Sequence, residues 1–123
     1  MGKVHNLEKD GSNKNLQVDQ LTSRQYQEVL DMMIKFRENK GWSLYHNLKD
    51  LAVSLSLEAA EVLEIFQWQD EQAELSRDRE IHLEEELADV LAYAFLMCGK
   101  LNLDPVKLVK AKTKINESRT WEV

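Results

Sequence analysis

Three glutamates recur at three-residue intervals in an apolar part of this chain. The stretch SLEAAEVLEIFQW, residues 56–68, carries Glu58, Glu61 and Glu64. In residues 51–66, 11 of 16 positions are apolar and they surround most of a helix circumference, so the predicted helix is buried on several sides. Glu58 and Glu61 then share one face, one turn apart. Ionised carboxylates in such a place need a compensating charge.

A second acidic pair lies in a still more apolar setting. Between positions 87 and 98 the only residue that is not apolar is Asp89, and it follows Glu86 by three positions. Tyr93 falls on the same helical face, four residues further on. If the two predicted helices pack antiparallel, four carboxylates converge. They are Glu58, Glu61, Glu86 and Asp89.

Four converging carboxylates predict a hard divalent cation. Like charges repel strongly in a low-dielectric interior, and a bound cation or a shared proton relieves that repulsion. Oxygen-only ligands select Mg²⁺, Mn²⁺ or Ca²⁺ over zinc or copper. Because Mg²⁺ keeps positions open for water and phosphate oxygens, we expect a phosphate-handling site that uses Mg²⁺, with Mn²⁺ able to replace it.

Two other interpretations of these acids compete with a metal site. A lone acidic pair at this spacing most often marks a solvated helix face, but here both pairs lie inside apolar helices. A di-iron bundle requires a histidine three residues after a glutamate, and none of the three histidines has that spacing. The spacing therefore favours the interpretation as a magnesium site.

The composition predicts one small all-α domain. The 123 residues are 43% hydrophobic and 31% charged, with one proline and four glycines, and no run alternates as a strand would. A chain of this size often needs a partner chain to cover its apolar faces. The single cysteine, Cys98, lies in an apolar run, so we expect a buried structural thiol in a reducing, cytoplasmic setting.

The net charge of −6 argues against a nucleic-acid surface, although a cation could still bring a small anion to the protein. The longest apolar run, residues 90–98, is too short to span a membrane, and the first residues show no apolar leader. We therefore expect a cytoplasmic protein that binds neither nucleic acid nor membrane.

Capping signals divide the chain into an arm and four helices. Residues 1–20 hold few large apolar side chains and are predicted to be a mobile arm, which leaves residues 21–123 as the folded domain. Thr22 with Gln25, Asn47, and Asp104 followed by Pro105 are the clearest predicted N-caps. The predicted helices span about residues 23–41, 48–68, 78–100 and 105–118.

Aromatic and basic residues near the acids fit a nucleotide. Trp42 lies in the predicted turn after the first helix and Trp68 at the end of the second, where they could sandwich a base, although aromatic residues usually fill cores. Most helical lysines face solvent, so we expect only one or two basic residues to contact phosphate. The candidates are Lys49, Lys110, Lys112, Lys114 and Arg119.

These motifs resemble those of the MazG-like nucleoside triphosphate pyrophosphohydrolases. The pattern ExxE, a spacer of 24 residues and then ExxD corresponds to EAAE at 58–61 and ELAD at 86–89. The segments GWSLYHNLKDLAVSLSLEAAEVLEIFQW, EEELADVLAYAF and KTKINESR are similar to the dCTP pyrophosphatase branch. The resemblance covers about residues 22–121.

The resemblance implies both a fold and a reaction. It implies an all-α MazG-like helical bundle that is completed by homodimerisation, in many members as a dimer of dimers, so that this chain would form a homodimer or homotetramer. The implied reaction is Mg²⁺-dependent hydrolysis of a (deoxy)nucleoside triphosphate to the monophosphate and pyrophosphate, as house-cleaning of the nucleotide pool. For this chain the resemblance favours dCTP or a modified cytosine nucleotide.

The resemblance also assigns roles to individual residues. The implied metal ligands are Glu58, Glu61, Glu86 and Asp89. The implied substrate-binding residues are Trp42, His46, Lys49, Trp68, Tyr93, Lys112, Asn116 and Arg119. Glu61 and Glu64 are the candidates for the catalytic base, although Glu64 fits an ordinary surface acid equally well.

Two departures from the branch leave the base preference open. Leu48 stands where the branch often has proline, and Arg119-Thr120-Trp121 replaces its RYP-like ending. A different class of function also fits the apolar helices. The chain could be a non-catalytic helical, oligomeric interaction protein whose acids form structural hydrogen bonds.

Overall fold

The computed structural model describes residues 15–69 and 74–119, and all regular structure in these ranges is helical. The elements are α1 (Arg24–Asn39), the short 3₁₀ helix η1 (Ser43–Tyr45), α2 (Leu48–Glu64), α3 (Arg77–Lys100) and α4 (Pro105–Glu117). No strand occurs in the described ranges. The predicted all-α class is therefore confirmed.

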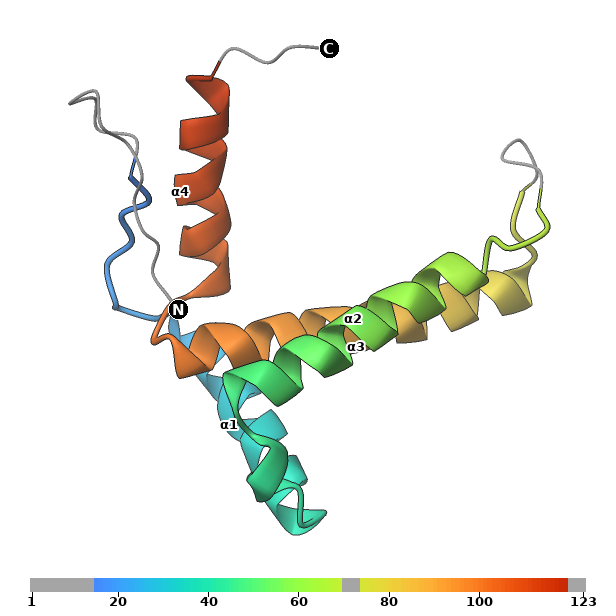
Figure 1. The fold of residues 1–123 in the computed structure, drawn as a ribbon, viewed down its shortest axis with the longest axis horizontal. Coiled ribbons are helices and arrows are strands. Elements are labelled where there is room, and N and C mark those ends of the chain that lie inside the picture. Colours follow the sequence, from blue (N-terminus) through green and yellow to red (C-terminus); the bar gives the residue numbers. More distant parts are fainter. Residues whose placement is uncertain (1–14, 70–73, 120–123) are drawn as a thin grey trace.

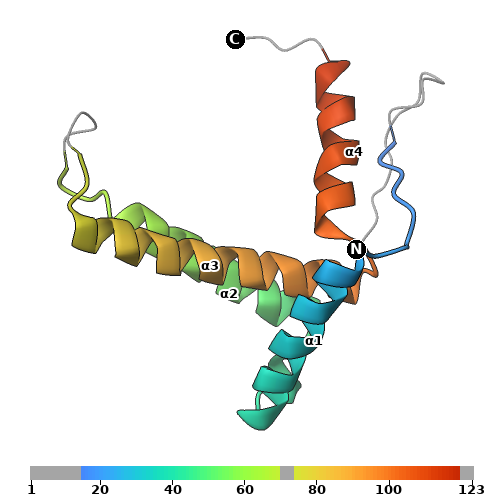
Figure 2. The same ribbon diagram turned by 180° about the vertical axis from the view of Figure 1, so that it is seen from behind.

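The helices α2 and α3 form an antiparallel pair that makes the long axis of the molecule (Figure 1). Near one end of this pair α1 packs against α3, and α4 projects away from the same end on the other side (Figures 1 and 2). The acidic pairs of the two helices were expected to meet if the helices packed antiparallel, and this packing is confirmed.

Side-chain caps determine where the helices begin. Asn47 caps α2 as predicted. The first helix is capped by Ser23 and not by Thr22: Ser23 Oγ accepts a hydrogen bond from the Tyr26 amide at 3.1 Å. The Thr22 hydroxyl instead donates to the side chain of Gln27 at 3.2 Å. The predicted capping box of Thr22 and Gln25 was therefore wrong, and the N-cap lies one residue later.

The end of α2 also differs from the prediction. The helix ends at Glu64, four residues before Trp68. The amides of Ile65 and Phe66 donate to carbonyls three residues back, which tightens the chain into a turn, and Trp68 has a φ of 66°. A positive φ is incompatible with a right-handed helix, so the last predicted turn cannot form. The bounds of α3 and α4 agree with the prediction to within about one residue.

Five buried apolar residues gather where α1, α2 and α3 meet. They are Tyr26, Leu30, Leu51, Leu96 and Cys98. The Tyr26 hydroxyl donates to the Phe95 carbonyl at 2.6 Å, and Gly99 lets α1 approach α3 because a Cβ there would lie 2.9 Å from the Leu30 methyl groups. The Cys98 thiol is buried and unbonded, as expected for a structural cysteine.

Many apolar side chains of α2 and α3 lie outside this core. Five of them are each at least 44% exposed: Val53, Leu57, Leu63, Leu87 and Leu91. Isolated exposed apolar residues are normal, but a series of them along two adjacent helices is typical of a surface that another chain covers. None of the helices in the described ranges is long and apolar enough to cross a membrane.

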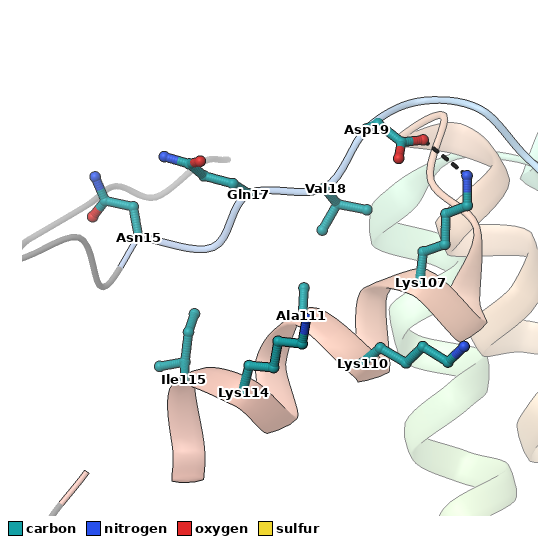
Figure 3. A pocket seen from close by; sticks show the side chains of 9 residues that line it. All are labelled: Asn15, Gln17, Val18, Asp19, Lys107, Lys110, Ala111, Lys114 and Ile115. Carbon is teal, nitrogen blue, oxygen red and sulfur yellow. Dashed lines mark hydrogen bonds and ion pairs between the residues drawn. The ribbon is translucent and has the colours of Figure 1, made fainter. Parts of the chain in front are cut away.

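The chain before α1 lies beside α4. Lys107 Nζ donates to Asp19 Oδ1 at 2.9 Å and to the Leu21 carbonyl at 2.7 Å. The two segments enclose a groove of about 390 Å³, which Figure 3 shows. Of the predicted arm, residues 1–14 lie outside the described residues, and its mobility stays a prediction.

Candidate metal centre

Three of the acids identified by their spacing meet between α2 and α3. One carboxylate oxygen from each of Glu58, Glu86 and Asp89 lies within 4.8 Å of the others. Glu58 comes from α2, and the other two come from adjacent turns of α3. Glu58 and Glu86 are half-buried and Asp89 is exposed, so the cluster is open to solvent on the Asp89 side.

The charges in the cluster act strongly on Glu58. Partial burial, followed by the charges of Glu61, Asp89 and Glu86, raises the pKa of Glu58 to about 7. A hydrogen bond with Glu86 acts in the same direction. Glu58 therefore holds a proton up to about pH 7 unless another positive charge takes its place. A divalent cation would supply that charge.

The donor set fits such a cation. Glu86 Oε1 lies 3.4 Å from His82 Nε2, whereas Glu86 Oε2 is buried and has no hydrogen-bond partner among the described residues. A buried oxygen without a donor is costly, and direct coordination of a cation would satisfy it. Because all three ligand atoms are carboxylate oxygens, the cluster suits Mg²⁺ or Mn²⁺ better than zinc.

Glu61 and Glu64 lie further along α2. Glu61 is half-buried and its charge reaches Glu58, but its oxygens are not part of the group that meets within 4.8 Å. Glu64 is exposed at the last residue of α2. The structure thus brings together three of the four predicted ligands, and the roles of Glu61 and Glu64 stay predictions.

Tyr93 and Trp42 lie around an arginine that the sequence did not single out. The guanidinium carbon of Arg37 is 5.7 Å from the centroid of the Trp42 ring and 5.8 Å from that of the Tyr93 ring. Arg37 is only 8% exposed. In the sequence it is one basic residue in the last turn of an amphipathic helix, and no spacing distinguishes it from a solvated one.

His46 belongs to the same neighbourhood. Its Nδ1 atom is buried and makes no hydrogen bond in the part of the chain that the structure describes. Burial, and then the positive charges of Lys100 and Arg37, lower the pKa of His46 below its usual value. His46 is therefore neutral at pH 7 and can act as a hydrogen-bond donor or acceptor for an uncharged group. Lys49 is exposed in the first turn of α2.

The other predicted substrate residues lie away from the cluster within one chain. Trp68 is 93% exposed and lies beyond the end of α2, whereas Trp42 precedes the start of α2. The two residues thus flank opposite ends of α2, whose 17 residues span about 25 Å. Lys112, Asn116 and Arg119 are on or just after α4, which projects away from the α2–α3 pair (Figures 1 and 2). That these residues bind substrate together with the acids stays a prediction, and it would require α4 of another chain in an oligomer.

The arrangement is similar to that of known pyrophosphatases. A crystal structure of a pyrophosphatase from Archaeoglobus fulgidus matches with a TM-score of 0.61 and 40% sequence identity, covering 79% of this chain and 93% of that one. The human (Homo sapiens) dCTP pyrophosphatase 1 is 29% identical over 98 residues, and the rat (Rattus norvegicus) protein of the same name is 28% identical over 98 residues. These matches cover 76% of this chain, which spans 57% of the length of those two relatives.

The matched region contains all of the acidic cluster. The MazG-like family profile matches residues 53–122, more than half of the chain. This range includes the ExxE and ExxD motifs and the whole of α3 and α4. The chain therefore belongs to the MazG-like family.

Proposed function

We propose that this protein hydrolyses nucleoside triphosphates to the monophosphate and pyrophosphate with the help of a divalent cation. The observation that carries the proposal is the group of carboxylate oxygens from Glu58, Glu86 and Asp89 that meet within 4.8 Å. Membership of the MazG-like family and the likeness to the pyrophosphatase from Archaeoglobus fulgidus support the same reaction.

The acids would hold the cation, and the cation would allow a polyanion to approach them. A triphosphate is repelled by a chain of net charge −6 and above all by the acidic cluster itself. We propose Mg²⁺ as the physiological ion, with Mn²⁺ as a substitute and Glu61 as a further ligand. When bound, such an ion neutralises phosphate oxygens and lowers the pKa of a coordinated water.

The chain itself would supply the base and the surroundings of the nucleotide. In the reaction a water oxygen attacks the α phosphorus, the bond from that phosphorus to the bridging oxygen breaks, and pyrophosphate leaves. A carboxylate must accept a proton from the water. Glu61 is the better placed candidate because its charge already acts on Glu58, whereas Glu64 is exposed at the end of α2.

A cytosine nucleotide is the proposed substrate class. The support is the similarity to two proteins named dCTP pyrophosphatase 1, at 28% and 29% identity. Trp42, Tyr93 and neutral His46 would lie around the nucleotide, with Lys49 near its phosphates. We propose dCTP or a modified cytosine nucleotide, and a house-cleaning role in the cytoplasm, where the free nucleotides are.

Self-association would complete the site. The exposed apolar residues of α2 and α3 form a surface suited to a second copy of the chain. In such a homodimer, or a dimer of dimers, α4 of one chain could bring its polar residues to the acids of another. Those residues are Lys112, Asn116 and Arg119.

Pyrophosphate release from a panel of canonical and modified triphosphates is the direct test. The assay should be run with Mg²⁺, with Mn²⁺ and with EDTA, and the nucleotide product identified by chromatography. We expect metal-dependent release of pyrophosphate and monophosphate, fastest with a cytosine nucleotide. If a folded, oligomeric protein turns over no triphosphate, the reaction is wrong and the non-catalytic interaction protein becomes the better hypothesis.

A further inference from the structure

We propose that Arg37 binds a phosphate oxygen of the nucleotide, as a substrate-binding residue separate from the acidic cluster. This inference rests on the proposed function and deepens it. It concerns the part of the triphosphate that the carboxylates and their cation do not hold.

Arg37 is a buried charge without a counter-ion. Its side chain belongs to a residue that is 8% exposed, and a guanidinium stays protonated at every physiological pH. Within the described ranges no carboxylate forms an ion pair with it and its guanidinium donates no hydrogen bond. The Nε atom is fully buried and unpartnered. Because buried charges are normally paired, this arrangement favours binding of an anion.

The two neighbouring rings position the guanidinium but do not neutralise it. Its carbon lies 5.7 Å from the Trp42 centroid and 5.8 Å from the Tyr93 centroid, near the outer limit of a cation–π contact. Such contacts restrain the side chain between α1 and α3. They leave the guanidinium hydrogens free to donate to a ligand, because a ring face accepts no directed hydrogen bond of comparable strength.

The other nearby groups add positive charge. The charges of Arg37 and Lys100 both reach His46, whose pKa they lower, and His46 Nδ1 is also buried without a partner. Glu38 is the one acid that acts on His46 in the opposite direction, and it forms no ion pair with Arg37. The surroundings of Arg37 are thus suited to an anion.

Tyr93 lies between Arg37 and the acids in the sequence of contacts, because its ring is near Arg37 and its helix carries Asp89 one turn away. Tyr93 follows Asp89 by four residues on α3, a rise of about 6 Å along the axis. Asp89 of the acidic cluster is therefore one helical turn from the tyrosine whose ring Arg37 contacts. A triphosphate carries more negative charge than one divalent cation neutralises, and an arginine can hold two oxygens of a phosphate at once. Arg37 is placed to take up that remaining charge.

The decisive comparison uses two variants of Arg37 and a matched control. Arg37→Met keeps the length of the side chain and removes the charge, while Arg37→Lys keeps the charge and loses the planar fork. Arg24→Met removes the same charge from the same helix at a site whose side chain is 93% exposed. Each protein is assayed for kcat and KM with the best triphosphate of the panel, and its thermal unfolding is recorded.

We expect Arg37→Met to raise KM about ten- to hundredfold, the range typical of a lost hydrogen bond to a charged group. Arg37→Lys should recover part of that loss, and Arg24→Met should match the wild type. A purely structural role would instead lower the unfolding temperature and leave KM unchanged for the molecules that remain folded. That pattern would overturn the proposal.

A binding measurement separates this proposal from the proposed reaction. Calorimetry with inorganic pyrophosphate and Mg²⁺ should show binding to the wild type that Arg37→Met weakens. If the wild type turns over no triphosphate, the proposed reaction is wrong. The titration still shows whether Arg37 binds pyrophosphate, because it does not depend on turnover. If neither variant folds, the NMR signal of the Arg37 Nε–H in the wild type should shift on addition of pyrophosphate. An unchanged signal would contradict the proposal.

Discussion

The pKa values of two carboxylates of this chain, Asp104 and Glu58, shift in opposite directions. Asp104 is 1% exposed at the start of α4. Its Oδ1 accepts hydrogen bonds from the amides of Val106 at 2.9 Å and Lys107 at 3.2 Å, and its Oδ2 accepts one from the Ser23 amide at 2.8 Å. These donors, with the Ser23 amide first, lower the pKa of Asp104 although burial alone would raise it.

Glu58 is less buried, yet its pKa is raised to about 7 because burial and three neighbouring acids act together. Burial raises the pKa of both side chains, and the hydrogen-bond donors around Asp104 outweigh that effect whereas the acids around Glu58 add to it. The ionised carboxylate of Asp104 is stabilised by the amides at the starts of α1 and α4, and it connects those two helices. The Glu58 cluster has no such amide donors in the described ranges, and a shared proton or a bound cation would compensate its charge. We therefore expect stability and function to depend on different carboxylates.

The largest expected effect is on activity, from Asp89→Asn. This substitution keeps the shape of the side chain and removes one charge of the cluster. We expect pyrophosphate release to fall by at least about a hundredfold, since even partners outside the first ligand sphere cost up to that much. The unfolding temperature should stay the same or rise because repulsion is relieved. Asp78→Asn, an exposed position on the same helix, is the control. An active Asp89→Asn enzyme would show that the cluster is not the metal site.

The next effect is on stability, from Asp104→Ala. The change leaves three amides without an acceptor, so we expect the free energy of unfolding to fall by about 2–4 kcal/mol, from a lost helix cap and a buried unpaired donor. Asp104→Asn should cost less because it retains a capping oxygen. Urea denaturation at fixed protein concentration measures both. Activity per folded molecule should persist, and a loss of activity without a loss of stability would contradict the proposed division of roles.

A third effect is the pH dependence that Glu58 imposes on the metal-free protein. Its pKa is about 7 in the folded chain against 4.5 as the ordinary value, so the folded state binds more protons between these values. The contribution to stability is complete below pH 4.5 and is lost as the pH rises through 7. In EDTA we therefore expect the unfolding temperature of the wild type to fall relative to that of Glu58→Gln as the pH rises from 4.5 through 7.

Added Mg²⁺ should cancel that loss at pH 8, because a bound cation favours the ionised carboxylates. The same thermal unfolding measurement, repeated with Mg²⁺, makes the test. A wild type that becomes more stable relative to Glu58→Gln as the pH rises in EDTA would contradict the raised pKa.

The smallest effect is expected from Lys107→Met. The amide of Lys107 donates to buried Asp104, but its ammonium group bonds Asp19, whose side chain is 61% exposed. Exposed ion pairs contribute little, so the urea midpoint should not change measurably. Residues 15–21 should nevertheless be cleaved faster in limited proteolysis, because they lose their contacts with α4. A large loss of stability would mean that the side chain, and not only the amide, supports this junction.

Local pattern was sufficient for two of the helix caps and for part of the site. The N-caps at Asn47 and Asp104 were predictable because a cap needs only a side-chain acceptor and amides two or three residues away. Glu58, Glu86 and Asp89 were found because helical periodicity places acids three residues apart on one face. These features depend on neighbours in the sequence, where the spacing itself is the signal.

Contacts between distant segments decided the rest. Ser23 is the cap of α1, and its amide bonds Asp104, 81 residues away. Arg37 is buried next to Tyr93, which comes from α3 and lies 56 residues further along the chain, and the tertiary arrangement also placed α4 away from the acids. Periodicity shows which face of a helix a residue occupies. Only packing determines what lies opposite that face, which is why three acids met and a buried arginine went unforeseen.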